Sequence, residues 1–268
     1  MNDQHPGAGS APSALLDRVS VSFPSSTGGT PTTVLKDVTI SCAPGEFLVI
    51  VGRSGCGKTT VLNALAGLTD YQEGEVAIMG QAPRRARDKI GYMFARDALI
   101  PSRTAQGNVE IGLEVRGVGK AERREVASGL MERLGLSGAE SRYPWQLSQG
   151  MRQRVALART WALDPQLVLM DEPFAALDAQ TRESVRSEFL GMWERRRSSV
   201  IFVTHDLTEA LLLGDRVIIM GQQGAILGDF PLPFARPRDP SELPFTPEFH
   251  ALERTLHSLL EGGSAPTD

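Results

Sequence analysis

The sequence has little of three things that mark particular protein classes. Only two of its 268 residues are cysteine, Cys42 and Cys56, which is too few for a disulfide framework and favours a reduced, cytosolic setting. Its apolar runs are short, so none approaches the roughly 18–20 residues of a membrane span. Its formal net charge is −4, so it lacks the overall positive charge that favours binding to nucleic acid. If the protein works at a membrane, another chain must do the spanning, and we expect no nucleic-acid partner.

The composition, with 41% hydrophobic and 22% charged residues, is that of an ordinary folded protein. Residues 1–12 have neither the basic start nor the apolar stretch of a secretion signal, so we expect a flexible polar lead-in there. The length fits one large domain or a domain with an attached lobe.

Apolar segments alternate with helical patterns along residues 13–230, which predicts an α/β core with a mostly parallel sheet. Runs such as EFLVIVG, LVLM and VIIM are apolar throughout, as in the buried strands of parallel sheets. Two earlier segments, LLDRVSVSF and TVLKDVTISC, are interpreted as strands, the first of them half-exposed, and we expect an antiparallel β edge on the N-terminal side. Between about residues 95 and 163 helical patterns dominate, which predicts an inserted helical lobe.

Residues 231–268 form a proline-rich connector followed by a predicted helix. Thr246 is placed to cap that helix and Pro247 to occupy its first position. We expect Gly262 and Gly263 to end it and its apolar face to pack on the core; that face carries Phe249, Leu252, Leu256 and Leu259.

The segment GRSGCGKTT matches G-x-x-x-x-G-K-[ST] between a buried strand and a helix, which is the context that a phosphate-binding loop requires. Its glycines allow consecutive backbone N–H groups to face an anion. Lys58 can reach terminal phosphates, and the Thr59 hydroxyl can ligate Mg²⁺. Cys56 is interpreted as a small residue that fits the loop. The predicted phosphate loop is Gly52, Arg53, Ser54, Gly55, Cys56, Gly57, Lys58, Thr59 and Thr60.

Acidic residues and a histidine follow two of the predicted strands. Asp171 ends the apolar run LVLMD and is placed to hold Mg²⁺, while Glu172 is placed to polarise a water for attack on the γ-phosphorus. His205 ends VIFVTH, and parallel strands present their carboxyl ends at the ligand edge, so it can orient that water. His5, His250 and His257 are interpreted as surface residues.

The segment LSQGMRQRVALAR begins with a turn and continues as a helical pattern whose first turn has no acidic residue. A helix start with free backbone N–H groups and a serine hydroxyl is suited to an anion. Together with the phosphate loop, LVLMDEP, AALD and VTHD, in this order and spacing, it resembles the ATP-binding subunit of ABC transporters over about residues 13–230. The resemblance implies a P-loop NTPase core, ATP and Mg²⁺.

In that family two copies close head to tail around their nucleotides. The resemblance therefore implies a homodimer in which Ser148 and Gly150 of one copy donate to the γ-phosphate held by the other. It also implies that Asp178 signals between the two sites and that Phe23 stacks on adenine, although Phe23 can also be an ordinary core residue at a strand end.

Two motifs depart from the family pattern. Gln149 and Met151 replace the third and fifth residues of the signature Leu-Ser-Gly-Gly-Gln, and Ala95 stands where a glutamine usually follows the phenylalanine. That glutamine would touch Mg²⁺ and the attacking water, so either a water or a nearby side chain (Arg96 or Gln106) substitutes, or hydrolysis is slow. We expect hydrolysis to persist with altered coupling.

DALIP, GNVEIGLE, LSQGMRQRVALART and RPRD most resemble the nitrate, sulfonate and taurine importers. This implies a peripheral place on the cytoplasmic face of the cell membrane, a separate membrane permease and an extracytoplasmic solute-binding protein. The DALIPS segment offers apolar residues for a permease helix or, equally, for packing of the helical lobe: Ala98, Leu99, Ile100 and Pro101. The alternatives are an ABC ATPase outside transport and a weakly catalytic regulator, which Ala95 suggests.

Overall fold

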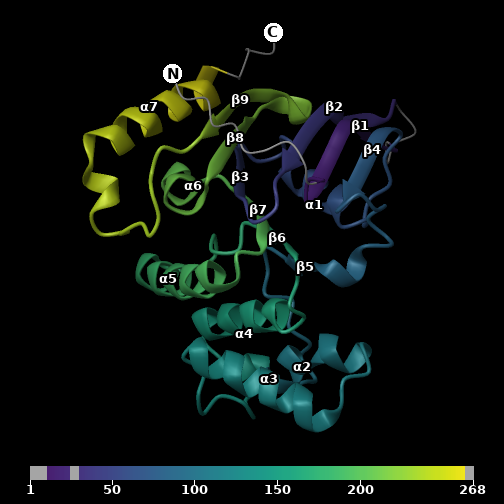
Figure 1. The fold of residues 1–268 in the computed structure, drawn as a ribbon, viewed down its shortest axis with the longest axis vertical. Helices are drawn as coiled ribbons and strands as arrows, with labels where there is room; N and C mark the ends of the chain where they lie inside the picture. Colours follow the sequence, from purple (N-terminus) through teal and green to yellow (C-terminus); the bar gives the residue numbers. More distant parts are fainter. Residues whose placement is uncertain (1–10, 25–29, 263–268) are drawn as a thin grey trace.

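A computed structural model describes residues 11–24 and 30–262, so most of the predicted polar lead-in lies outside the described residues. The described chain is a mixed α/β structure with two sheets, and a group of helices extends from one end of it (Figure 1). No helix in the described ranges is both long and apolar enough to cross a membrane.

The larger sheet has six strands in the order β5-β6-β7-β3-β8-β9. The first five run parallel, and β9 pairs antiparallel with β8. Strand β3 is buried along its whole length, as its unbroken apolar run predicts. Strand β7 is also buried along its whole length, including the serine and threonine at its ends. The strands are β3 (Phe47–Gly52), β5 (Ile90–Met93), β6 (Leu167–Asp171), β7 (Ser199–Thr204), β8 (Arg216–Met220) and β9 (Ile226–Pro231).

The expected antiparallel component is a sheet of its own, with the order β2-β1-β4. It comprises β1 (Ala14–Phe23), β2 (Thr32–Cys42) and β4 (Glu73–Ile78). Helix α1 (Lys58–Leu65) contacts strands of both sheets, and its buried Val61, Leu62 and Leu65 belong to a core that both sheets share. Because α1 packs on strands of both sheets, the position of its first turn relative to those strands is fixed.

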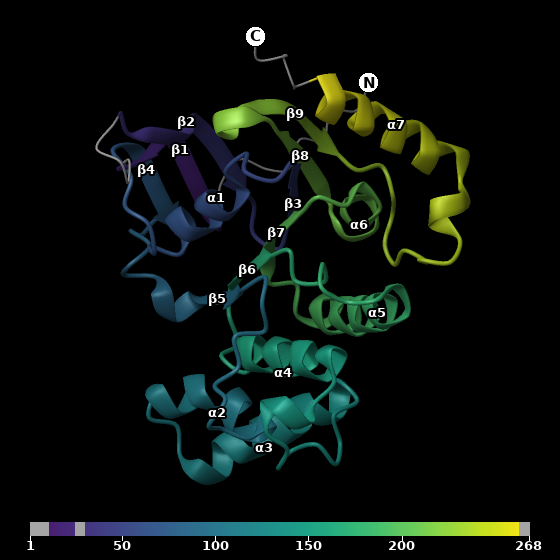
Figure 2. The same cartoon turned by 180° about the vertical axis from the view of Figure 1, so that it is seen from behind.

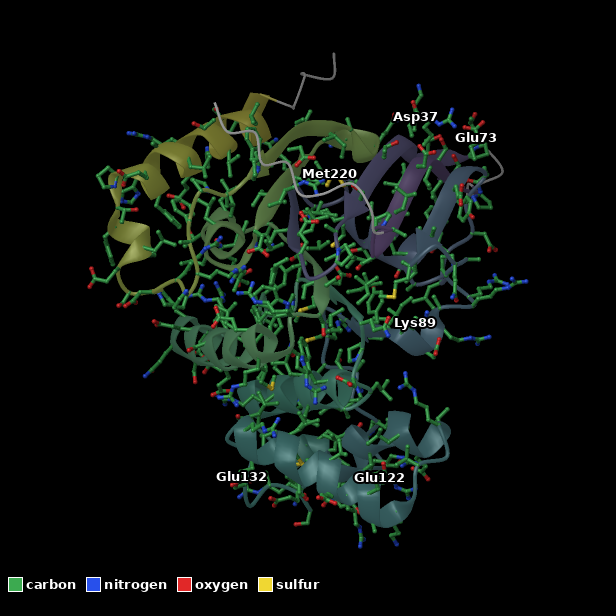
Figure 3. The ribbon with its side chains drawn as sticks, viewed as in Figure 1. Asp37, Glu73, Lys89, Glu122, Glu132 and Met220 are labelled. Atoms are coloured by element: carbon green, nitrogen blue, oxygen red, sulfur yellow. The ribbon has the colours of Figure 1, made fainter. Side chains whose placement is uncertain are left out.

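Helices α2 (Ala105–Val115), α3 (Lys120–Arg133) and α4 (Gln149–Trp161) pack on one another at the end of the molecule opposite β1 and β2 (Figures 1 and 2). Glu122 and Glu132 extend from the outer side of α3 (Figure 3). Helix α5 (Ala179–Arg196) joins α4 to the core, where Trp193 and Phe189 meet Phe47 of β3 edge to face. The short 3₁₀ turns are η1 (Arg87–Lys89), η2 (Pro144–Gln146), η3 (Gln222–Gly224) and η4 (Leu243–Phe245).

Helix α7 (Pro247–Gly262) packs on α6 (Leu207–Leu213), as the amphipathic pattern predicts. Phe249 and Leu256 are buried, and the Thr246 hydroxyl accepts a hydrogen bond from the Phe249 N–H at 3.3 Å. The connector is held by Arg238, whose guanidinium donates to the carbonyls of Leu211 and Gly214 at the end of α6. The connector therefore fixes where α7 lies.

Candidate active site

The predicted phosphate loop joins β3 to α1, with Gly52 as the last residue of the strand and Lys58 as the first of the helix. Gly57 has φ 113°, and a Cβ there would lie 2.6 Å from Cδ2 of Leu35. A Cβ on Gly52 would lie 2.5 Å from the Met220 carbonyl oxygen, so both positions require glycine. No side chain caps α1 and no acidic residue lies in its first turn, which leaves its N–H groups available to an anion.

Lys58 lies inside this loop, only 5% exposed. Its Nζ donates to the carbonyl oxygens of Gly52 at 2.7 Å and Arg53 at 3.2 Å. The same nitrogen lies 3.6 Å from Oε1 of Glu172. The ammonium group is therefore held between the phosphate loop and the end of β3. Its hydrogen bonds now go to carbonyl oxygens, and phosphate oxygens of a triphosphate can take the place of those acceptors.

Thr59 and Asp171 meet across the site. The Thr59 hydroxyl donates to the two Asp171 carboxylate oxygens at 3.1 and 3.0 Å. Burial raises the pKa of Asp171, and the Thr59 hydrogen bond partly opposes that shift. A hydroxyl and a carboxylate converging in this way are oxygen ligands of the type that Mg²⁺ takes beside phosphates, so the residues fit the ion.

Glu172 and His205 complete the group. Strands β6 and β7 are parallel with Asp171 opposite Val203, so their carboxyl ends bring the two residues together. Glu172 has φ 43°, a left-handed conformation, and its N–H donates to the Val203 carbonyl at 2.9 Å. Its Oε2 lies 2.9 Å from Nδ1 of His205, whose side chain is 60% exposed. The carboxylate is therefore shared between Lys58 and His205 at the open edge of the sheet.

A cavity of about 580 Å³ adjoins this group, and α7 forms one of its walls. Arg53, His205 and Thr208 line it from the core, and Arg254 and His257 line it from α7. The Thr208 hydroxyl donates to Oε1 of Glu253 at 2.9 Å, which joins α6 to α7 beside the cavity. The sequence indicates the helix but carries no signal for the surface it covers, so the position of α7 beside His205 is a finding of the structure.

Helix α4, which begins at the signature residues, lies apart from the phosphate-loop helix α1 (Figures 1 and 2). Ser148 caps α4, and its hydroxyl accepts from the Met151 N–H at 3.2 Å. Gly150 packs against α5, where a Cβ would lie 2.5 Å from Cγ2 of Thr181. Asp178 caps α5, and the N–H and hydroxyl of Thr181 lower its pKa. Within the described residues no hydrogen bond joins Ser148, Gly150 or Asp178 to the loop.

The remaining loop residues and Phe23 differ in exposure. Arg53, Ser54 and Gly55 are exposed and Thr60 is half-buried. Phe23 ends β1 with 42% of its surface exposed, which leaves its ring available to a ligand. Cys56 is buried and burial raises the pKa of its thiol, as expected for a residue with a packing role.

Ala95 lies at the same edge of the sheet. Met93 pairs with Met170 in the parallel β5–β6 ladder. Ala95 and Glu172 each come two residues after this pair, so Ala95 lies beyond the end of β5, the strand next to the one that Glu172 follows. In the described ranges neither Arg96 nor Gln106 forms a hydrogen bond to Asp171, Glu172 or His205.

Of the two alternatives for DALIPS, packing of the helical lobe holds for Leu99. Leu99 is 8% exposed and belongs to the main core, because the chain turns inward there between the exposed Ala98 and Pro101. Ile100 is half-buried, and its N–H donates to the side chain of Asn108 at 2.6 Å.

Comparison with known proteins identifies the family. A family model described as ABC transporter matches residues 35–175. The chain belongs to the ABC transporter family. As an ABC ATP-binding protein it is an ATPase with the predicted P-loop NTPase core.

Relatives of this ABC ATP-binding protein include the taurine import ATP-binding proteins TauB of Escherichia coli and Shigella sonnei. Each is 42% identical over 210 residues, which are 78% of this chain and 82% of the relative. Among solved structures, two of the cassette MJ0796 are similar. One is a dimer in a post-hydrolysis state with ADP and Pi, 33% identical with a TM-score of 0.75, and it covers 83% of this chain and 100% of its own. The other, also dimeric, is 32% identical with a TM-score of 0.74 over the same shares of both chains.

Proposed function

We propose that this ATPase powers import of a small organosulfonate such as taurine through a separate membrane permease. The taurine importers among its relatives support the substrate class, as does the subgroup resemblance of the sequence. In this proposal the chain lies on the cytoplasmic face of the membrane, held by the permease, and an extracytoplasmic solute-binding protein delivers the solute.

The observation that carries the chemistry is the convergence of Lys58, Thr59, Asp171, Glu172 and His205 on one edge of the sheet. The glycine loop and the free N–H groups of α1 bind the phosphates of ATP, and Lys58 neutralises the terminal ones. Thr59 and Asp171 would hold Mg²⁺, which supplies charge neutralisation of the phosphates when bound.

Glu172 is the general base in this proposal. Its carboxylate takes a proton from water as the water oxygen bonds to the γ-phosphorus and the bond to the bridging oxygen of ADP breaks. His205 lies within hydrogen-bond distance of Glu172 and would keep that carboxylate and the γ-phosphate in position relative to each other.

Two copies are needed for a complete site. Ser148 and Gly150 lie away from the phosphate loop of their own copy, and the related cassette MJ0796 forms dimers. We place the partner subunit's Ser148 and Gly150 against the γ-phosphate, with the partner subunit's Asp178 beside them, because Gly150 and Thr181 bring the starts of α4 and α5 into contact. Phe23 would stack on the adenine.

The position of Ala95 favours a second candidate, an ABC protein that binds ATP but hydrolyses it slowly. The methyl group of Ala95, beyond the end of the strand that neighbours β6, can neither ligate Mg²⁺ nor orient a water molecule. We favour the full ATPase, because Lys58, Asp171, Glu172 and His205 are all in place.

The decisive experiment is transport by the complete system. The chain is expressed with its permease and solute-binding protein in cells that otherwise lack taurine uptake, and labelled taurine is followed. We expect uptake that a Lys58→Ala variant loses. Copurification with the permease but no taurine uptake would overturn the substrate class, and copurification with ribosomes or nucleic acid instead would overturn the transport function.

A further inference from the structure

Two aromatic side chains lie exposed just before the signature serine. Trp145 is 67% exposed and Tyr143 is 36% exposed. Their rings are stacked, with centroids 4.6 Å apart and planes 9° from parallel. The pair therefore presents a flat, rigid π surface to its surroundings, which is a surface that aromatic ligands stack on.

The loop that carries the pair is held firmly. The Tyr143 N–H donates to Oε1 of Gln146 at 2.8 Å, and the Gln146 N–H donates to the Tyr143 carbonyl at 2.8 Å. Pro144 and Leu147 are buried on either side of Trp145. The inward residues anchor the turn while Trp145 is left outside, so little conformational entropy remains to be lost when Trp145 meets a ligand.

The loop lies next to the residue that reaches the nucleotide of the other copy. Trp145 precedes Ser148 by three residues, which span at most about 10 Å of chain. If the partner subunit's Ser148 contacts the γ-phosphate, the partner subunit's Trp145 lies within about one nucleotide length of that point. The same nucleotide has its adenine at the other end, where Phe23 is 42% exposed.

We propose that Trp145 of one copy, backed by Tyr143, stacks on the adenine held at Phe23 of the other copy. The inference rests on the head-to-tail pairing of the proposed function. An adenine has two faces, and Phe23 covers one of them. The aromatic pair covers the second face only when the copies close, so the base as well as the γ-phosphate drives closure.

The proposal predicts that the ring contributes to pairing and not to the first binding of ATP. Stacking of a base on an aromatic side chain corresponds to about 5- to 150-fold in an equilibrium constant. We therefore expect Trp145→Ala to weaken ATP-driven pairing by a factor in this range and to leave ATP binding to the separate copy unchanged. Trp145→Phe keeps a ring and should restore most of the loss.

Pairing is measured by sedimentation of the full chain in a Glu172→Gln background with ATP. Val115, 83% exposed at the end of α2, gives the matched control, because Val115→Ala also removes exposed apolar surface from the same group of helices. At concentrations that saturate both variants, replacing ATP by ribose triphosphate, which lacks the base, should weaken pairing of the parent and not of Trp145→Ala.

Intrinsic fluorescence gives a second readout. Trp161 and Trp193 are buried and Trp145 is the exposed tryptophan, so the part of the ATP-induced change in emission that Trp145→Phe removes reports Trp145. We expect a change that Trp145→Phe abolishes.

Unchanged pairing by Trp145→Ala, with the parent pairing on ATP, would overturn the proposal and leave the proposed function intact. Lost copurification with the permease at unchanged pairing would overturn it too, by assigning Trp145 to the permease contact. If the Glu172→Gln parent itself fails to pair on ATP, the head-to-tail arrangement is wrong and the proposal falls with it.

Discussion

Replacing Glu172 by glutamine tests the assignment of the base most directly. The amide keeps the volume of the side chain and a polar contact to His205 at 2.9 Å, and it removes the negative charge that lies 3.6 Å from Nζ of Lys58. Glutamine meets the same left-handed backbone at φ 43° as glutamate does, so the free energy of unfolding should change little.

The expected effect is on turnover. A positioned general base contributes about 10²- to 10⁴-fold, which is about 2.7–5.4 kcal/mol in activation free energy. We expect phosphate release to fall by this factor in Glu172→Gln. ATP should bind at least as tightly, because the carboxylate that repels the γ-phosphate is gone.

The assay measures phosphate release and ATP-driven pairing on the same preparation, in the presence of the permease. Glu122→Gln on the outer side of α3 removes one negative charge far from the site and serves as the control (Figure 3). Turnover within threefold of the wild type, with Glu122→Gln also normal, would refute the role of Glu172 as base.

Three further predictions follow from named contacts. Asp171→Asn should raise the melting temperature of the nucleotide-free protein near neutral pH. Burial raises the pKa of Asp171, so the ionised carboxylate lowers the stability of the fold as pH rises through that pKa. The gain from the substitution should therefore vanish in acid, and an equal gain at every pH would contradict this. Arg238→Ala should lower the free energy of unfolding by about 2–4 kcal/mol in denaturant titration, because it leaves carbonyls of α6 without donors; a loss under about 0.5 kcal/mol would show that water replaces them. Ala95→Gln should raise the ATPase rate or its coupling to transport in the assembled complex; no change in either would remove Ala95 as the cause of altered coupling.

The residues of the site could be predicted because each follows a local pattern. The phosphate loop joins a buried strand to a helix, and Asp171 and His205 each lie at the end of an apolar run. Parallel pairing of β6 with β7 then brings the strand ends together. The exposure of Phe23 was left open, since alternation along β1 does not say whether its last residue is covered.

Long-range packing could not be predicted in the same way. Burial of Leu99 depends on a turn that faces the helices, and the pairing of β4 with β1 depends on their register, with Ala14 opposite Ile78. The place of α7 depends on hydrogen bonds from Arg238 to α6, far away in the sequence. The role proposed for the helix start at Ser148 depends on a second copy, so it follows from one sequence only through family resemblance.

The two thiols of the protein have a practical consequence for spectroscopy. Cys42 and Cys56 are both free and buried, and burial raises the pKa of each, so little reactive thiolate forms near neutral pH. A maleimide or spin label should therefore select a cysteine introduced on the surface, with both native cysteines left in place. Distances between such labels on two copies could follow opening and closing without altering the phosphate loop.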